Sequence, residues 1–287
     1  MKMINLTKRN LILYFSNKSN VFFSLLASLI SFGLFILFIK NNLQAKWHAT
    51  SIYKGLLDNW IIGGTLNTTA ISASLTALTR YVYDKSNNVI ADISLTDLYF
   101  KHLQASYLLS AMIISTIMQL FTFLFMSTYF SLADKINFQW NLIPTILPTM
   151  LFVSLVWTSF GFIIASLINN QDALSGCYSI INTLAGFFAL VYFPLMTLPK
   201  FGQLIIKLTP TPYVSAIYRN ILMHDTVNQA FKNTPLKIVN NFKDQININI
   251  GNFKTLSSQL LILIGFILLF IFISLIISLR QRKNLID

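Results

Sequence analysis

The side chains that could perform covalent or metal chemistry are few in this sequence and stand far apart. All nine acidic residues are Asp, and the three histidines are isolated from one another. The single cysteine, Cys177, excludes an intrachain disulfide and a cysteine-based metal site. The sequence has no G-x-x-x-x-G-K-[ST] phosphate loop, no H-E-x-x-H and no G-x-S-x-G. We therefore expect a chain that is not an enzyme and that has no catalytic residue, metal or cofactor of its own.

The side chains that remain for function are neutral hydrogen-bonding groups within apolar segments. Two segments carry small and hydroxyl residues at helical spacing: Gly64, Thr68, Ser72 and Thr76 in one, and Ser175, Ser179, Asn182 and Gly186 in the other. Such rows let helices approach closely and hydrogen-bond across their contact. A buried amide needs partners. Asn67 and Asn182, together with Thr68 and Ser72, are therefore expected either to hold helices together or to line a pathway.

The composition is that of an integral membrane protein. Apolar residues make up 55% of the 287 residues and charged residues only 10%, against about 25% charged in soluble domains. The net charge of +12 is carried next to apolar segments, so we expect anionic lipid headgroups as partners and no nucleic acid. Asn, Ile, Lys and Phe are abundant and Glu is absent, as in proteins from AT-rich bacterial genomes. We therefore expect a bacterial cytoplasmic membrane.

Six apolar segments are long enough to cross that membrane. About 20 helical residues suffice, because each rises about 1.5 Å and the hydrocarbon layer is about 30 Å thick. No charged residue lies within the six cores, although ion-coupled carriers usually need such residues. The sequence thus predicts an all-α integral membrane domain over residues 1–287. Its expected spans are residues 21–39, 60–79, 103–132, 142–168, 173–195 and 256–279.

An even number of spans places both termini on one side, which the bases close to the span ends indicate to be the cytoplasm. Residues 8–19 have bases at both ends and apolar residues between. They are too short to span, and we expect a helix lying flat at the membrane surface. The alternative is one longer, tilted first helix.

Prolines interrupt the chain after the fifth span. Pro194, Pro199, Pro210 and Pro212 forbid a continuous helix. The apolar residues between them are too few to span, so backbone at that depth would have to be buried against protein. The alternative is an ordinary external loop. Residues 196–255 form the expected external segment.

Residues 80–102 connect the second and third spans and contain a second short helical pattern. Ser94 is an expected N-cap with Asp97 three positions later. Leu95, Leu98 and Tyr99 then share one face. That face would be buried either against a partner protein or against the chain's own bundle.

Two of these segments resemble the membrane subunit of ABC-2 type transporters, the permease half of many bacterial exporters. They read RYVYDKSNNVIADISLTDLYFKHLQASYLLSA (80–111) and FPLMTLPKFGQLIIKLTPTPYVSAIYRNIL (193–222). The resemblance covers the whole chain in topology: surface helix, six spans and basic tails. The family's re-entrant motif is matched by Phe193-Pro194, Leu198-Pro199, Thr209-Pro210, Tyr213 and Arg219.

The resemblance implies a partner and a mechanism. It implies that residues 199–222 form two short re-entrant helices in the outer leaflet. It places a coupling helix, which docks on a separate ATPase subunit, at residues 92–102, so that Asp92 joins Ser94, Leu95, Asp97, Leu98 and Tyr99. ATP and Mg would then be bound by the ATPase, and a second permease copy or a related permease would complete the pathway. The chain departs from the family where Asp84 and Asp92 replace a Glu-rich stretch and Ser94 replaces a common Pro.

The resemblance thus predicts a dimeric, ATP-driven exporter, with a drug, an antibiotic peptide or another amphiphile as its substrate. Two other functions remain open from the residues alone. One is a secondary carrier or channel, which intramembrane charge or paired broken helices would indicate. The other is an immunity or sensor protein that sequesters a peptide without transport.

Overall fold

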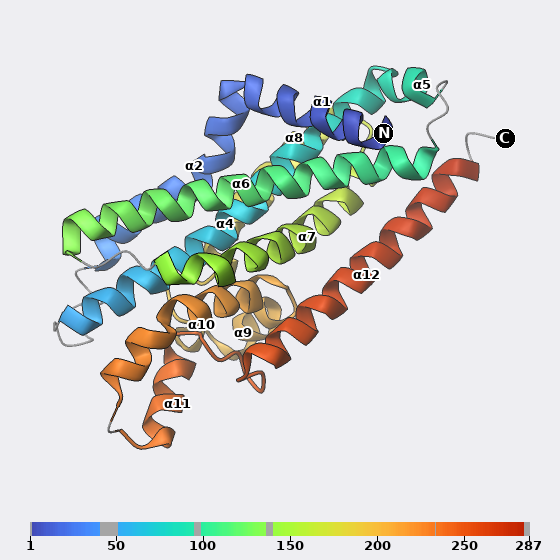
Figure 1. The fold of residues 1–287 in the computed structure, drawn as a ribbon. Helices are drawn as coiled ribbons and strands as arrows, with labels where there is room; N and C mark the ends of the chain where they lie inside the picture. The colour runs from blue at the N-terminus through green and yellow to red at the C-terminus, as the bar shows by residue number, and fades with distance from the viewer. Residues whose placement is uncertain (1, 41–50, 95–98, 136–139, 233, 284–287) are drawn as a thin grey trace.

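The computed structural model describes residues 2–40, 51–94, 99–135, 140–232 and 234–283. Within these residues the chain forms eleven α-helices and no strand, apart from an isolated bridge between Ile250 and Phe253. The long helices run side by side as an elongated bundle (Figure 1). The expected all-α class is confirmed.

Five helices are long and apolar enough to cross a membrane, as in a multi-pass membrane protein. Each corresponds to one of the six expected spans. They are α2 (Lys18–Leu34) continued by η1 (Phe35–Ile39), α4 (Ser51–Ser86), α6 (Phe100–Asp134), η2 (Trp140–Leu142) continued by α7 (Ile143–Leu167), and α12 (Leu256–Lys283).

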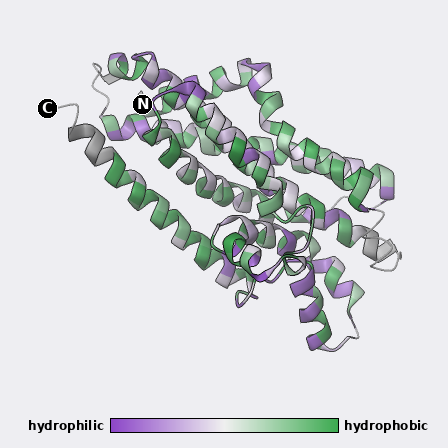
Figure 2. Cartoon of the chain, turned by 180° about the vertical axis from the view of Figure 1, so that it is seen from behind, coloured by the Kyte–Doolittle hydropathy of each residue, from purple (hydrophilic) through white to green (hydrophobic). Residues whose placement is uncertain are grey.

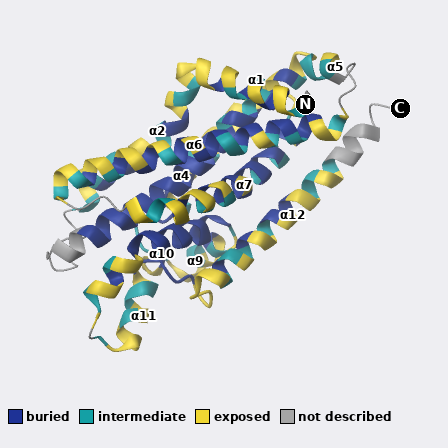
Figure 3. Ribbon diagram, viewed as in Figure 1, coloured by how far each residue is buried: buried dark blue, intermediate teal, exposed yellow. Residues whose placement is uncertain are grey.

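Helix α4 lies at the centre of the bundle and contacts α2, α6, α7, α8 and α10. Of its most apolar stretch 94% is buried inside the protein, whereas the corresponding value for α12 is 17%. Mean hydropathy decreases as burial increases: α4 has the lowest hydropathy of the five helices and α12 the highest. Figures 2 and 3 show this contrast between the green, exposed α12 and the buried α4. Polar residues are thus kept inside, and the outer helix presents apolar side chains, as a lipid environment requires.

The expected fifth span differs from the structure. Helix α8 (Gln171–Phe188) begins near the predicted position but ends seven residues before Leu195, and it is not among the five long apolar helices. Leu190 has φ of 55°, Leu190 N–H donates to Phe187 O, and Val191 N–H donates to Gly186 O. This pair of bonds around a left-handed residue is the Schellman arrangement, which ends a helix. Hydropathy alone does not detect such a stop.

The N-terminal segment forms a helix of its own. Helix α1 covers Lys2–Ser16, somewhat earlier than the expected residues 8–19. Asn17 separates it from α2 and caps α2, since the Asn17 side chain accepts a hydrogen bond from the Asn20 N–H. The chain bends between α1 and α2 (Figure 1). The alternative of one continuous first helix is therefore wrong.

The segment between α8 and α12 is mostly helical. It contains η3 (Leu195–Thr197), α9 (Lys200–Lys207), α10 (Thr211–Ala230) and α11 (Leu236–Gln245). Only α9 has the expected short length. Helix α10 has 20 residues and packs against α4, α7 and α12, so the prediction of two short helices ending near Leu222 is wrong. The alternative of an ordinary external loop does not describe α10 either, because most of its side chains are buried.

The two ends of the bundle carry different elements. The beginning of α1, helix α5 (Val89–Ser94) and the last turn of α12 lie at one end, called the near end (Figure 1). The end of η1, the beginning of α4 and the end of α6 lie at the other, called the far end. Because α1 and α12 begin and end the described chain at the near end, the arrangement agrees with termini on one side of a membrane.

Candidate functional site

A groove of about 720 Å³ lies between α2, α4 and α8. Helix α4 contributes Ser72, Thr76 and Thr79 to its floor, and α8 contributes a wall of hydroxyl and amide side chains. The two rows of small and hydroxyl residues that stand about 100 positions apart in the sequence thus meet at one site. The α8 residues are Ser175, Ser179, Asn182 and Thr183.

No described residue that lines this groove is charged. The opposite wall comes from α2, with Asn20 and Ser31 as its hydrogen-bonding side chains and Phe23 and Ile30 among its apolar ones. The Ser31 hydroxyl lies 3.0 Å from the Tyr192 hydroxyl, which closes one end of the groove. The lining therefore offers neutral donors and acceptors beside apolar and aromatic surface.

Two polar atoms in the groove have no hydrogen-bond partner within the described part of the chain. They are the Oγ of Ser72, a residue with no exposed surface, and the Oδ1 of Asn182. Thr183 differs, because its hydroxyl donates to the Ser179 carbonyl oxygen at 2.9 Å. Buried polar groups in proteins are nearly always paired, so Ser72 and Asn182 are the side chains with free hydrogen-bonding capacity.

A second cavity of about 400 Å³ continues the groove along α4. It shares Asn20, Thr76, Thr79 and Gln171 with the first cavity. It then passes α1 and reaches Arg80, the only charged residue among its described lining. The two cavities together form a polar path along one face of α4 toward the near end.

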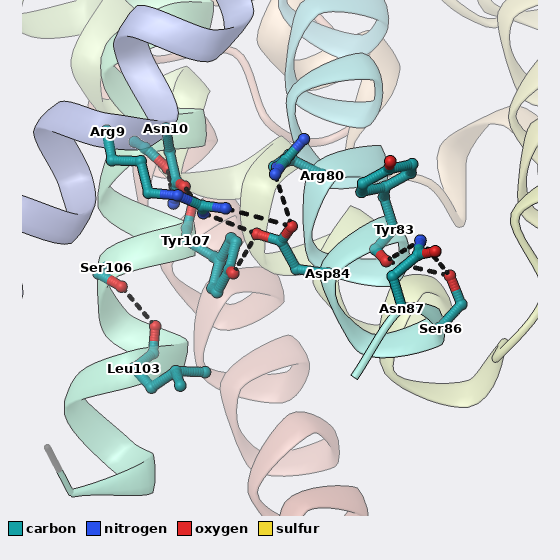
Figure 4. A network of polar contacts seen from close by, with 11 residues as sticks. Arg9, Asn10, Arg80, Tyr83, Asp84, Ser86, Asn87, Leu103, Ser106 and Tyr107 are labelled. Carbon is teal, nitrogen blue, oxygen red and sulfur yellow. Dashed lines mark hydrogen bonds and ion pairs between the residues drawn. The ribbon is translucent and has the colours of Figure 1, made fainter. Parts of the chain in front are cut away.

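Asp84 joins three helices where this path ends (Figure 4). The fully buried Asp84 carboxylate accepts hydrogen bonds from Arg9 Nη1 at 2.8 Å and Tyr107 Oη at 2.6 Å, and Arg80 Nη2 lies 2.7 Å from Asp84 Oδ1. The hydrogen bond that Arg9 donates to Asp84 raises the pKa of Arg9 above its usual value. These four residues, called the Asp84 cluster, fasten α1 to α4 and α6.

A second charged cluster lies at the far end. Lys40 Nζ is 3.3 Å from Asp58 Oδ1 and also forms an ion pair with Asp134. The ammonium group lies 4.9 Å from the centre of the Phe130 ring. Lys40, Asp58 and Asp134, called the Lys40 cluster, thus connect the end of η1 to α4 and α6.

Arg219, the last residue of the expected re-entrant motif, is completely buried. Its Nη2 donates to Leu190 O at 2.8 Å and to Ala189 O at 3.4 Å, and its Nε donates to Trp60 O at 3.3 Å. The guanidinium carbon lies 4.5 Å from the centre of the Trp60 ring. Arg219 thus pairs carbonyl groups that the end of α8 leaves without a helical partner.

The other residues of that motif mark the boundaries of the short helices. Pro194 precedes η3, Pro199 precedes α9 and Pro210 precedes α10. The buried Tyr213 donates from its hydroxyl to Lys207 O at 3.0 Å, which ties α10 to α9. These three prolines precede the short helices, as the sequence predicted, whereas Pro212 lies in the first turn of α10 and does not interrupt it.

Asn67 and Thr68 do not line the groove. Asn67 Nδ2 donates to Thr211 O and Ser215 Oγ, each at 2.8 Å, and Asn67 Oδ1 accepts from Trp157 Nε1 at 3.0 Å. Thr68 donates to Thr65 O within its own helix. Asn67 therefore fastens α4 to α7 and α10, whereas Ser72 and Asn182, the other two candidates, face the groove.

Sequence reasoning missed a buried set of hydrogen bonds around Gln119. Gln119 on α6 donates to Ser154 Oγ on α7 at 2.8 Å and accepts a hydrogen bond from the Tyr218 hydroxyl on α10. The sequence contained a sign of these contacts, because Gln119 is an amide within an apolar span and a buried amide needs hydrogen-bond partners. Asp84 was also visible as a departure from a Glu-rich pattern, but not as a partner of Arg9 and Tyr107.

The expected coupling helix differs in the structure. Asp92 lies exposed on α5, and Ser94 ends α5 instead of beginning a helix, so its assignment as an N-cap is wrong. Leu95, Asp97 and Leu98 lie outside the described residues. Tyr99 is 76% exposed and is the N-cap residue of α6. Among the described residues of this segment, α5 ends at Ser94 and α6 begins at Phe100, where one helix over residues 92–102 was expected.

No protein-family model matches the chain, and no curated protein matches it. What the fold establishes is the class, an all-helical multi-pass membrane protein. Within the described residues, no group of three or more His, Cys or Asp side chains could hold a metal ion.

Proposed function

We propose that this chain is the permease subunit of an ATP-driven exporter of the ABC-2 type, and that the groove between α2, α4 and α8 belongs to its translocation pathway. The observation that carries the proposal is the groove itself. An open, hydrogen-bonding surface on apolar helices is costly in lipid unless it faces a partner or a passing molecule. A second copy, or a related permease, facing this groove would enclose it.

The energy source in this proposal is a separate ATPase bound at the near end. The described lining of the groove contains no Asp, His, Lys or Arg, the residues that usually couple transport to ions, which favours an external source over an ion-coupled carrier. ATP and Mg would be bound by the ATPase. Residues 80–102 would form its docking segment on the cytoplasmic side, where the near end lies if the termini are cytoplasmic.

The Asp84 cluster supplies a route from the docking segment to the groove. Asp84 precedes α5 by five residues and lies on α4, the helix that also carries Ser72 and Thr76. Its bonds to Arg9 and Tyr107 make α1 and α6 move with α4. An ATPase that binds one arrangement of this segment more tightly would bias the bundle between closed and outward-open states.

Co-purification with a candidate ABC ATPase from the same genome tests the proposal. We expect a stable complex in detergent, with ATP hydrolysis that depends on the permease. Tyr99→Asp should abolish the complex, because Tyr99 is an exposed aromatic side chain in the docking segment. Leu236→Asp is the matched control, since Leu236 is 80% exposed but lies on α11, away from the near end.

The outcomes separate the alternatives. Loss of the complex in Tyr99→Asp and its retention in Leu236→Asp would support the permease function and locate the docking segment. A folded wild-type chain that binds no ATPase would contradict the proposal. Sequestration of a peptide without transport would then be the next function to test.

A further inference from the structure

The lining of the groove carries information about what the groove binds. Its hydrogen-bonding groups are hydroxyls and amides from three helices, and the described lining contains no Asp, Lys, Arg or His. Phe23, Phe187 and Tyr192 supply aromatic surface beside them. A surface of this kind recognises hydroxyl or amide groups attached to an apolar body, because each polar group of the ligand finds a neutral partner.

The buried side chain of Ser72 and the buried amide oxygen of Asn182 point to a ligand independently of this row. Ser72 Oγ and Asn182 Oδ1 have no hydrogen-bond partner in the described residues, although Ser72 has no exposed surface. Asn67 lies five positions before Ser72 on the same helix, and both its amide nitrogen and its amide oxygen are paired. The amide of Asn67, which holds helices together, is thus fully hydrogen-bonded. Ser72 Oγ and Asn182 Oδ1, at the groove, keep their hydrogen-bonding capacity.

A charged ligand group would have no partner in the groove. Transfer of an ion from water to an apolar environment without a counter-charge is strongly unfavourable. The first charged side chain along the path is Arg80 in the adjoining cavity, and Arg80 is held by Asp84 at 2.7 Å. The groove therefore discriminates against ions by leaving their charge unpaired.

We propose that the groove binds the uncharged, hydroxyl- or amide-bearing part of an amphiphile and excludes charged groups, with Ser72 and Asn182 as hydrogen-bonding residues for that part. This inference rests on the proposed transport function and adds the substrate class to it. It concerns only the portion of the molecule that occupies the groove. A charged headgroup would have to remain outside.

Thiol accessibility tests the inference on the whole chain in lipid vesicles, without any ATPase. Cys177 is replaced by Ser, and a single reporter thiol is introduced by Ser179→Cys, at a position whose side chain faces the groove. The probes are three methanethiosulfonates of similar size: neutral 2-hydroxyethyl, anionic sulfonatoethyl and cationic trimethylammonium-ethyl. Gln229→Cys on the exposed face of α10 is the water-accessible control, and Leu268→Cys on the exposed face of α12 is the lipid-facing control.

We expect the neutral reagent to modify the Ser179→Cys variant about tenfold faster or more than either charged reagent, after each rate is divided by that of the Gln229→Cys variant. The Leu268→Cys variant should react slowly with all three reagents, because a thiol in an apolar environment stays protonated. Equal rates for the three reagents in the groove variant would overturn the exclusion of charge and leave the transport proposal intact. Rates in the groove variant as low as those in the lipid-facing control would show that the groove is closed or filled by lipid, and would overturn this inference.

A second comparison tests the two named residues. The neutral hydroxyethyl reagent is compared with the apolar propyl reagent on the Ser179→Cys variant. Ser72→Ala and Asn182→Leu, each added to that variant, should reduce the preference for the hydroxyl-bearing reagent by about threefold to tenfold, the effect of one neutral hydrogen bond. Thr128→Val on α6 is the matched control and should leave the preference unchanged, because Thr128 lines neither cavity and its hydroxyl donates to the Leu124 carbonyl oxygen. An unchanged preference in both groove variants would overturn the roles assigned to Ser72 and Asn182.

Discussion

Nη2 of Arg219 donates a 2.8 Å hydrogen bond to the carbonyl oxygen of Leu190, so the side chain of one helix completes the C-terminus of another. Leu190 follows α8 in a left-handed conformation, with φ of 55°. A leucine in this region is uncommon and mildly strained. The contact with Arg219 on α10 stabilises that turn, and it fixes the point at which α8 stops and the chain turns toward α9.

Replacing Arg219 should therefore destabilise the protein. Arg219→Leu leaves buried carbonyl groups of Trp60, Ala189 and Leu190 with fewer donors. We expect the free energy of unfolding to fall by about 3 kcal/mol, measured as a lower thermal unfolding midpoint in detergent. Gln229→Leu, on the exposed face of the same helix, should change it little. Equal midpoints for the two variants would show that Arg219 does not stabilise the turn.

A glycine pair makes room for this arginine. A Cβ atom on Gly63 would lie 3.0 Å from Arg219 Cγ, and one on Gly64 would lie 2.8 Å from Val191 Cγ2. We expect Gly64→Ala to lower the free energy of unfolding by about 1–3 kcal/mol through overpacking. Gly176→Ala on α8 is the control, because nothing lies within 4 Å of its added Cβ.

The Gly176→Ala control should not lower the free energy of unfolding. Alanine favours a helix over glycine by about 0.5–1 kcal/mol, so this control should be neutral or more stable in the same thermal assay. If Gly64→Ala and Gly176→Ala destabilised the protein by similar amounts, the contact between α4 and Val191 would not be the reason for a glycine at position 64.

The sequence predicts a feature of this fold well when the feature depends on residues close together in the chain, and poorly when it depends on contacts between distant residues. The length of the apolar segments located the five long helices, and the prolines at 194, 199 and 210 located the interruptions, because both signals are local. The end of α8 was missed, since Leu190 gives no local sign of a left-handed turn. The length of α10 was missed as well. Polar residues such as Ser215 suggest a loop until a partner is known, and Asn67 lies 148 positions away.

The same reasoning applies to the groove. Spacing alone identified the rows containing Ser72 and Asn182 as faces of helices, but it could not say whether the two faces meet. Nor could it separate Asn67 from Asn182, which are equally polar and equally surrounded by apolar residues. The placement of α7 and α10 against α4 gives the Asn67 amide its hydrogen-bond partners. The Asn182 amide oxygen, at the groove, has none among the described residues.

Removing the charge of Asp84 should weaken the attachment of α1. Asp84→Asn leaves the guanidinium groups of Arg9 and Arg80 near one another without a carboxylate between them. We expect a loss of about 3 kcal/mol and faster proteolysis within α1. Arg9→Gln should cost less, about 1 kcal/mol, because its side chain is 34% exposed. A larger effect for Arg9→Gln than for Asp84→Asn would contradict this order.

The contribution of Arg9 should not vary with pH in the neutral and moderately alkaline range. Its pKa is raised in the folded protein above its already high ordinary value, chiefly by the hydrogen bond to Asp84. A raised pKa contributes stability that is fully present below the unfolded value and is lost only as pH rises through the folded value. The difference in unfolding midpoint between wild type and Arg9→Gln should therefore stay constant from about pH 7 to about pH 10. A difference that shrinks within this range would show that the ion pair loses its charge below the pKa expected for Arg9, and would contradict this prediction.

A single substitution of Lys40 should destabilise the protein, and a second substitution in the Lys40 cluster should recover part of that loss. Lys40→Met removes the only cation in contact with the Asp58 and Asp134 carboxylates among the described residues, and all three side chains are largely buried. We expect a loss of about 3 kcal/mol, because two like charges are left together. Asp58→Asn added to Lys40→Met should recover part of that loss, since only one carboxylate then remains. Thermal unfolding of the four proteins of this cycle measures the coupling, with Lys101→Met at the exposed beginning of α6 as a control. If the double variant were less stable than Lys40→Met alone, Asp58 would be stabilised by its other surroundings, and Lys40 would pair with Asp134 alone.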